Sequence, residues 1–507
     1  MQKLKSIYIY CAILIITLSF ACSHGAPEFD PYKEASPAPG EEWVPSEEEQ
    51  EKSFELEELP TIPIELEPDA GSLRLSQLVD IALANNPTTQ IAWEDARAAA
   101  AAWAEARGLY YPQITGSAEY FYARDGGSST GADAFREQYG NVGLSLNYLL
   151  LDFGGREAEI DAARLALVNA NWNQNQAIQN VLNEVAVSFY DYIGSKALVI
   201  ADETNLEEAE TSLEAADLRL EAGVGTLPDV LQARATLAQV QLNLVEDRGN
   251  VEILRGELAT SVGWPSNTDF DVSDPVDELP LDALADNVND LIDLAMENRP
   301  DLAAVQASVR EAQANLREAK SEFFPEISAT AQVLRFWVRP EGEASEYFTN
   351  YLLGVQLSVP IFQGFTIINS VRQASAELES TKAALRFQEQ IVIDEVWAAY
   401  YNFRTAVQSL DAATVLLESS IESYNASLEL YRNGVGDIIE LLTAQTTLAE
   451  ARAEQVQTTT DIFTSYADLI NAMGTEIPSP QEIVIEEEVI IDSEGGVEEV
   501  INEEIEN

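Results

Sequence analysis

The chain carries the same unit twice, and this duplication limits its possible folds more than any other feature. Residues 78–87 read LVDIALANNP, and residues 291–300 read LIDLAMENRP, an offset of 300 − 87 = 213. Residues 108–118 match residues 321–331 at the same offset. Further matches follow in the same order. The chain is therefore expected to contain two copies of a unit far longer than ordinary solenoid repeats, over residues 72–265 and 289–476.

Each copy opens with an alanine-rich helical pattern. One helix is expected from near Leu75 and another from near Leu291, each running until Pro112 or Pro325 stops it. Proline has this effect because it disfavours helical geometry in the residue before it. Both copies are therefore expected to begin with one uninterrupted helix.

Alternating segments come next, and they predict two strands in each copy. The expected strands are about 113–124, 141–152, 326–339 and 350–362. Their apolar positions recur at every second residue, which is typical of a strand with one apolar face: Val142, Leu144, Leu146, Tyr148, Tyr351, Leu353, Val355, Leu357 and Val359. The spans are near the length that crosses a bilayer, although a soluble sheet would alternate in the same way. Four residues are candidate interfacial aromatics: Tyr120, Tyr122, Phe336 and Trp337.

Two long stretches without proline, residues 155–222 and 365–433, predict long helices. At 1.5 Å per residue each would reach roughly 100 Å. Apolar residues at spacings of three and four favour lateral packing like that of a coiled coil, with the other face in water. Such lengths suit a tube better than a compact enzyme.

Each long helix runs into Gly-Val-Gly, at residues 223–225 and 434–436, and another helical pattern follows at once. Glycine permits the positive φ that often ends a helix. We therefore predict tight turns that reverse the chain. The alternative interpretation of these turns is a plain helical hairpin that binds no partner.

The N-terminus has the pattern of a secretory signal, expected at residues 1–21. Lys3 and Lys5 precede an apolar core at residues 7–20, which is too short for a comfortable membrane span. Cleavage before Cys22 would leave a cysteine for lipid attachment, and ordinary cleavage after Ala21 is the alternative. No other stretch is long and apolar enough for a transmembrane helix, so strands would have to cross any membrane.

Three acidic segments lie outside the copies: a proline-rich linker at 22–71, a linker at 266–288 and a tail at 477–507. The chain has 28 Lys and Arg against 87 Asp and Glu, a formal charge of −59. A polyanion of this kind repels nucleic acid, so no nucleic-acid partner is expected.

Enzymatic chemistry has little support in the residues. The only histidine, His24, lies in the first linker, and Cys22 is the only cysteine after the signal. No cysteine pair for zinc and no phosphate-binding glycine loop is present. The chain is expected to be no enzyme and to bind no cofactor or metal, so energy for transport would come from a partner.

Taken together, residues of about 73–476 resemble the TolC-like outer membrane efflux protein family. The resemblance rests on an ordered set of motifs that occurs twice: Asn86-Pro87 with Arg299-Pro300, Tyr111-Pro112 with Phe324-Pro325, DFGGR at 152–156, PIFQG at 360–364, and the paired turns. The second corner lacks the Gly-Gly-Arg of the first. The resemblance implies a mainly α fold with long coiled-coil-like helices, which form a trimeric α-barrel, and with a small transmembrane β-barrel.

Physical argument supports the same assembly. Four strands cannot close a barrel, and open edges are not tolerated in lipid. Two copies would give eight strands with an interior filled by side chains, whereas three give a 12-stranded barrel with a channel. The resemblance implies trimers of this kind, so a homotrimer in the outer membrane is expected.

The resemblance also implies a role and partners. The chain would be a passive duct across outer membrane and periplasm that exports drugs, metals or other small molecules. It would dock on a periplasmic membrane fusion protein, the adaptor, and an inner membrane pump. The docking rim would be Gly223, Val224, Gly225, Thr226, Gly434, Val435 and Gly436.

The resemblance further implies an acidic entrance just past the turns. Glu440 matches the usual first acid, Asp437 and Asp229 are further candidates, and Thr443 stands where a second acid is usual. The alternative is that these are acids in the first turn of a helix, favoured by the helix dipole. For the whole chain, two other functions remain open: a type I protein secretion duct, and a coiled-coil spacer or adhesin without a channel.

Overall fold

The computed structural model describes residues 72–124, 136–273, 287–340 and 344–475. The chain divides into a unit at 1–59 and a unit at 60–507, and every described residue lies in the second unit. The predicted signal peptide, Cys22, the whole first linker, and the acidic tail lie outside the described residues.

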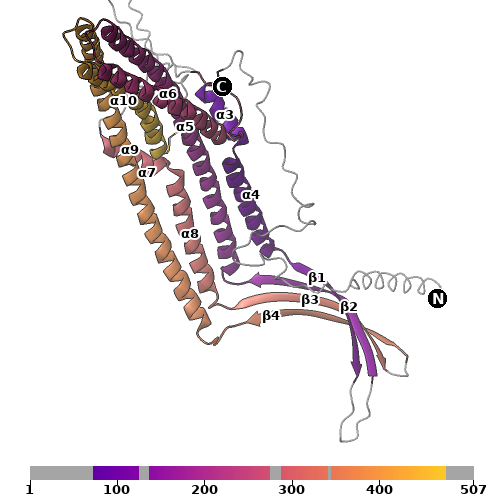
Figure 1. Cartoon of the computed structure of the whole chain (residues 1–507). Helices are drawn as coiled ribbons and strands as arrows, with labels where there is room; N and C mark the ends of the chain where they lie inside the picture. The colour runs from indigo at the N-terminus through magenta and orange to yellow at the C-terminus, as the bar shows by residue number, and fades with distance from the viewer. Residues whose placement is uncertain (1–71, 125–135, 274–286, 341–343, 476–507) are drawn as a thin grey trace, which may run out of the picture. The chain divides into compact units, whose positions relative to one another are not determined.

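Apart from the short η3 of the first copy, both copies have the same order of elements within the described residues: two helices, two strands, a long helix and a shorter helix (Figure 1). In the first copy these are α3 (Leu75–Asn85), α4 (Pro87–Arg107), the short η3 (Gly108–Tyr110), β1 (Gln113–Arg124), β2 (Arg136–Leu151), α5 (Gly155–Glu221) and α6 (Leu227–Ser261). In the second they are α7 (Val288–Asn298), α8 (Pro300–Ser321), β3 (Glu326–Pro340), β4 (Glu346–Ser358), α9 (Thr366–Arg432) and α10 (Ile438–Ala472).

The expectation of one uninterrupted helix at the start of each copy is wrong. Asn86 separates α3 from α4, and Arg299 separates α7 from α8. Both have extended geometry, with φ −69° and ψ 124° at Asn86 and φ −67° and ψ 122° at Arg299. The cause is the proline that follows each of them, because it excludes helical ψ before it and then starts the next helix.

These two breaks close each copy onto its own last helix. The Asn86 side chain donates to the carbonyl oxygen of Ser261 at 2.7 Å. In the second copy Arg299 stands in place of Asn86, and Ala472 stands in place of Ser261. Arg299 donates to the carbonyl oxygen of Ala472 at 3.3 Å. A helix C-terminus leaves carbonyls without internal partners, and these side chains satisfy one in each copy.

Arg299, itself buried, also forms a partly buried ion network. It is 8% exposed, and it pairs with Asp301 at 2.6 Å and with Glu395 of α9 at 2.5 Å. Burial alone would raise the pKa of Asp301, but hydrogen bonds and the charge of Arg299 lower it below the usual value. The positive charge of the buried Arg299 is therefore balanced by two carboxylates.

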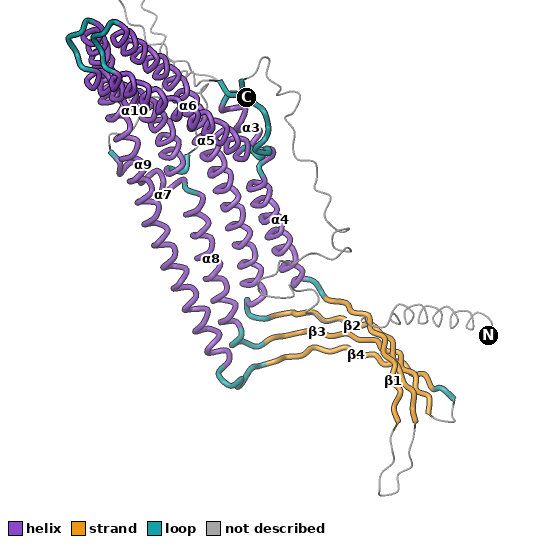
Figure 2. The backbone as a smooth tube through the Cα atoms, viewed as in Figure 1, coloured by secondary structure: helices purple, strands orange, loops and turns teal. Residues whose placement is uncertain are grey.

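The four strands form one antiparallel sheet in the order β1-β2-β3-β4 (Figure 2). Three predicted bounds are wrong: β2 begins at Arg136 rather than 141, and β4 begins at Glu346 rather than 350 and ends at Ser358 rather than 362. The early end of β4 has a simple cause, since Pro360 has no N–H for the ladder.

One face of this sheet is apolar and exposed. The register places Leu146 beside Ala331, and Ala331 beside Leu353, which is 87% exposed. A shallow cavity of about 610 Å³ on this face is lined mainly by apolar side chains. The predicted alternation is thus present, but its apolar side does not face a core in the described residues.

Two of the predicted aromatics meet across a glycine. Tyr120 of β1 and Trp337 of β3 both lie opposite Gly140 of β2, and their rings stack with centroids 5.6 Å apart. A Cβ on Gly140 would lie 2.9 Å from the Trp337 ring. The missing side chain therefore makes room for the stack.

The long helices α5 and α9 have 67 residues each. α5 packs beside α4 and α8, and also beside α6 and α10. α9 packs beside α8 and α10. Across the ranges the structure describes, no helix has both the length and the apolar character needed to cross a membrane.

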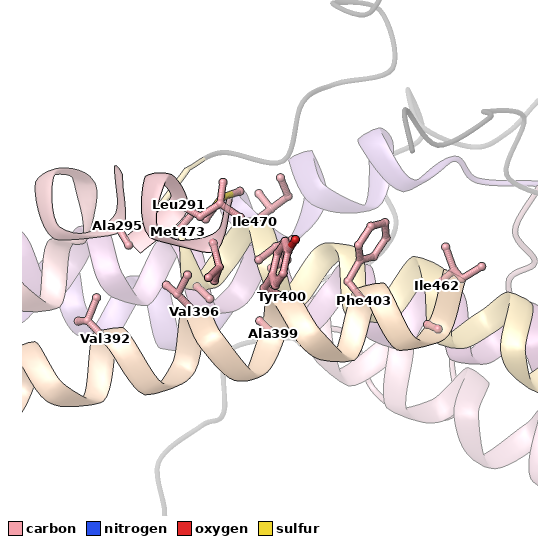
Figure 3. Packing of buried hydrophobic residues seen from close by; sticks show 14 residues of the cluster. Leu291, Ala295, Val392, Val396, Ala399, Tyr400, Phe403, Ile462, Ile470 and Met473 are labelled. Atoms are coloured by element: carbon pink, nitrogen blue, oxygen red, sulfur yellow. The ribbon is translucent and has the colours of Figure 1, made fainter. Parts of the chain in front are cut away.

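The core consists of separate clusters along these helices, and the largest lies where α7, α9 and α10 meet (Figure 3). Val392, Val396 and Tyr400 on α9 follow a spacing of four and face Leu291 and Ala295 of α7. The first copy repeats this cluster on α3 and α5 with Leu78, Ala82, Val181, Val185 and Phe189. Each large apolar side chain buried there contributes about 1.5–3 kcal/mol.

Candidate functional site at the helical tips

The two Gly-Val-Gly segments reverse the chain tightly, as predicted. Gly223 and Gly434 have positive φ, 73° and 78°. The N–H of Gly225 donates to the carbonyl of Arg219 at 2.9 Å, and the N–H of Gly436 donates to that of Leu430 at 2.9 Å. Such bonds satisfy the last carbonyls of α5 and α9.

The second glycine of each turn is required by crowding. A Cβ on Gly225 would lie 2.9 Å from the backbone nitrogen of Leu220, and one on Gly436 would lie 3.0 Å from that of Tyr431. The neighbouring atoms are backbone and cannot move aside without opening the turn. Each turn thus needs glycine at both positions, for two different reasons.

Between the glycines stand two exposed valines. Val224 is 65% exposed and Val435 is 79% exposed. Exposed apolar side chains at the ends of two adjacent hairpins form a surface that a partner could cover. The seven predicted rim residues divide accordingly: the glycines shape the turns, the valines are exposed, and Thr226 is the N-terminal cap of α6.

Thr226 and Asp229 form a reciprocal cap on α6. The Thr226 hydroxyl accepts from the N–H of Asp229 at 3.4 Å, and the Asp229 carboxylate accepts from the N–H of Thr226 at 3.0 Å. Asp437 caps α10 by accepting from the N–H of Ile439 at 3.1 Å. Both acids therefore have a structural role at a helix N-terminus.

Glu440 differs from those two acids. It lies in the first turn of α10 and is exposed. Among the described residues, none forms a side-chain hydrogen bond or an ion pair with its carboxylate, whereas Asp229 and Asp437 are both engaged. Of the three predicted entrance acids, Glu440 is the one whose carboxylate has no partner among the described residues.

A contact that the sequence did not predict joins the two tips. Arg219, in the last turn of α5, donates from Nη1 to the carbonyl oxygen of Tyr431, in the last turn of α9. The guanidinium carbon lies 4.4 Å from the centroid of the Tyr431 ring. Burial raises the pKa of Tyr431, and the charge of Arg219 opposes this. The only sequence signal was that both residues stand in the last helical turn before a Gly-Val-Gly.

Behind this contact, apolar side chains from α5, α6, α9 and α10 pack together. Ala216 and Val230 from the first hairpin meet Leu441 and Leu448 from the second. Farther along, Arg452 of α10 pairs with Glu208 of α5 at 2.6 Å. The two hairpins of one chain are thus joined as one body at this end.

Comparison with known proteins agrees with this arrangement. The model of the outer membrane efflux protein family matches residues 78–264 and 291–475, one match for each copy. Protein CyaE of Bordetella pertussis is 26% identical over 431 residues, which cover 83% of this chain and 89% of that protein. The toluene efflux pump outer membrane protein TtgC of Pseudomonas putida is 25% identical over 414 residues, covering 79% and 82%.

Solved structures show the same fold. The outer-membrane channel OprN has a TM-score of 0.71 at 20% identity, covering 79% of this chain and 90% of that one. VceC of Vibrio cholerae has a TM-score of 0.68 at 17% identity, covering 79% and 96%. The helical pairs, the four-stranded sheet and the twofold internal repeat are thus those of a known architecture, and the chain belongs to the outer membrane efflux protein family.

Proposed function

We propose that this protein is the exit duct of a tripartite efflux system, joined through a periplasmic adaptor to an inner membrane pump. The observation that carries the proposal is the shape of the tips. Two hairpins of one chain end side by side, each with an exposed valine between two glycines, and Arg219 and Tyr431 join them. A rigid end with a small exposed apolar surface suits docking to another protein.

The sheet supports assembly into a homotrimer. Within the described residues β1 pairs only with β2, and β4 pairs only with β3, so both edges have backbone groups available for a neighbour. Edges of this kind must be paired inside lipid. Three copies would close 12 strands around a channel, while two would close eight around a filled interior.

The exposed apolar face of the sheet is proposed to contact outer membrane lipid. Leu353, Val355 and Leu357 are all more than half exposed and lie on one strand. A contiguous apolar face of this kind is costly in water and favourable in hydrocarbon. Lipid attachment at Cys22 would add a second anchor, and it stays a prediction.

The duct itself is proposed to be passive and without enzymatic activity or cofactor, with the pump supplying the energy and choosing the cargo. Relatives of similar identity have names that refer to different cargoes: toluene for TtgC of Pseudomonas putida at 25%, and pyoverdine for OpmQ of Pseudomonas aeruginosa at 24%. That variety supports small-molecule cargo that the duct does not select.

Glu440 is proposed to contribute charge to the periplasmic entrance. Three copies would place three exposed carboxylates near the tips, which would attract cations. Asp229 and Asp437 would add charge there, although their carboxylates also cap helices.

The direct test is photo-crosslinking in cells from a reactive residue at position 435. A covalent product with a periplasmic adaptor is expected, because Val435 lies at the exposed tip. A reactive residue at position 415 is the matched control, since Val415 is 63% exposed on the same hairpin but lies within α9. Equal capture from both positions, or none from 435, would refute docking at the tips.

A further inference from the structure

A cavity with an unusual lining lies away from the tips, where α5, α6 and α10 meet. Its volume is about 350 Å³. Four acidic residues line it: Asp202 on α5, Glu246 and Asp247 on α6, and Glu450 on α10. No Lys or Arg is among the lining residues. Carboxylates from three helices that surround one cavity produce a negative potential there.

A buried amide in the same cavity has no hydrogen-bond partner. Gln445 of α10 is 3% exposed, and neither its amide oxygen nor its amide nitrogen meets a partner among the described residues. Asp202 is 7% exposed, and its Oδ1 accepts from Asn205 at 3.1 Å while its Oδ2 has no donor. Unsatisfied buried polar atoms cost about 1–3 kcal/mol each. A ligand that donates hydrogen bonds would satisfy the two oxygens among these atoms, Gln445 Oε1 and Asp202 Oδ2.

The nearby arginines are already engaged. Arg452 donates to Asn205 at 2.6 Å and pairs with Glu208 at 2.6 Å. Arg248 pairs with Glu203 at 2.7 Å. These ion pairs hold both guanidinium groups beside other carboxylates, so the four lining acids lack a protein counter-ion within the described residues.

The spacing of these acids favours an organic cation over a metal ion. In the part of the chain that the structure describes, no three His, Cys, Asp or Glu side chains converge closely enough to hold a metal ion. Ammonium groups need less convergence, since each offers three donors and can lie on a flexible apolar stem. Leu198, Val240 and Ala449 provide apolar lining for such a stem.

We propose that this cavity binds an organic ammonium ion of the short diamine class. One ammonium group lies between Asp202 and Asp247 and donates to the Gln445 amide oxygen, while the second lies toward Glu450. The site is in the protein wall formed by three helices of one chain, and it does not depend on the proposed docking at the tips.

Proton release accompanies binding. Burial, a hydrogen bond with Asp202, and the charges of Asp202 and Glu246 raise the pKa of Asp247 to about 6. In the free protein below this pH, a proton on Asp247 provides the donor that Asp202 Oδ2 lacks. A bound ammonium replaces that proton. The charged groups around Asp247 come from all three helices. They are Asp202 on α5, the ion pair of Glu203 with Arg248, Glu246 on α6, and Glu450 and Arg452 on α10. Affinity should therefore rise with pH through about 6.

The test is calorimetric titration of the purified full chain in nonionic detergent with 1,4-diaminobutane. Saturable binding at one site per chain is expected, with affinity about tenfold weaker near pH 5 than near pH 7.5, since pH 5 lies one unit below the pKa. The neutral analogue 1,4-butanediol should not bind. Magnesium chloride at matched ionic strength should not compete beyond screening.

Variants separate the site from general charge effects. Asp247→Asn should weaken binding at least about tenfold and remove its pH dependence, and Gln445→Leu should also weaken it. Glu210→Gln removes the same charge from an exposed position of α5 and should change nothing. Absence of saturable binding by the unmodified protein, equal loss in Glu210→Gln, or full displacement by magnesium would overturn the proposal. If Asp247→Asn fails to fold, Gln445→Leu with the pH series decides the matter.

Discussion

Arg219 lies over the ring of Tyr431, with its guanidinium carbon 4.4 Å from the ring centroid, and donates to that residue's own carbonyl oxygen. One side chain thus satisfies a carbonyl at the end of α9 and covers an aromatic ring. Because Arg219 belongs to the first copy and Tyr431 to the second, the contact joins the tips of the two copies.

Replacing Arg219 with Leu should loosen the tips relative to each other. The contact is worth about 1–2 kcal/mol, as a cation–π pair with a charge-assisted hydrogen bond. Spin labels at positions 224 and 435 would report a broader distance distribution by double electron–electron resonance. Arg248→Leu is the control, because its partner Glu203 is exposed and far from the turns in sequence. Equal widths for Arg219→Leu and the unmodified protein would contradict the prediction.

Alanine at the second glycine of each turn should open it. In Gly225→Ala and Gly436→Ala the new Cβ would meet backbone atoms at 2.9 to 3.0 Å, and each change should cost about 1–3 kcal/mol locally. Hydrogen exchange of the amides at 223–225 and 434–436 would show the loss as faster exchange. Gly249→Ala in α6 is the contrast, since nothing lies within 4 Å of its Cβ, and it should stabilise the helix by about 0.5–1 kcal/mol. Slow exchange in both tip variants would show that the turns tolerate the side chain.

Removing Arg299 should leave Asp301 as a partly buried charge without its partner. Arg299→Met is expected to cost about 3–5 kcal/mol, measured as a fall in the thermal midpoint. Arg97→Met, which breaks the exposed pair with Glu94, should cost at most about 1 kcal/mol. Similar midpoints for these two variants would count against a structural role for the Arg299 network.

The same network predicts an acid dependence. The pKa of Asp301 is lowered in the folded chain. Its contribution is therefore present above the unfolded value of about 3.9 and is lost as pH falls through the lower folded pKa. Thermal midpoints recorded from pH 7 down to pH 3 should fall less steeply at the acid end in Asp301→Asn than in the unmodified protein. Parallel curves would assign the acid sensitivity to other carboxylates.

Neutralising Glu440 should reduce cation preference without disturbing the helix start. Its carboxylate is exposed and caps nothing in the described structure, so Glu440→Gln should leave stability within about 0.5 kcal/mol. In planar bilayers with a salt gradient, the reversal potential of Glu440→Gln should shift toward that of a nonselective pore, while Glu440→Asp retains the charge and the potential. An unchanged potential in Glu440→Gln would return Glu440 to the helix-dipole interpretation.

Local rules in the sequence were enough to predict the repeated unit, the long helices, the four strands and the two turns. Helical spacing over 67 residues without proline, period-two alternation, and glycine after a helix are each determined by neighbours along the chain. The family resemblance rested on the same ordered motifs. The helix breaks at Asn86 and Arg299 also have a local cause, the prolines at 87 and 300, which belong to the same repeated motifs.

Tertiary structure alone decided which distant residues meet. Arg219 meets Tyr431 across 212 positions, and Asp202, Asp247 and Gln445 line one cavity from three helices. Periodicity shows that a helix has an apolar face, but the rotation and register of one long helix against another depend on the packing of many side chains at once. For the same reason, three acids near the tips looked alike in the sequence, and only their hydrogen bonds distinguished the caps Asp229 and Asp437 from the unengaged Glu440.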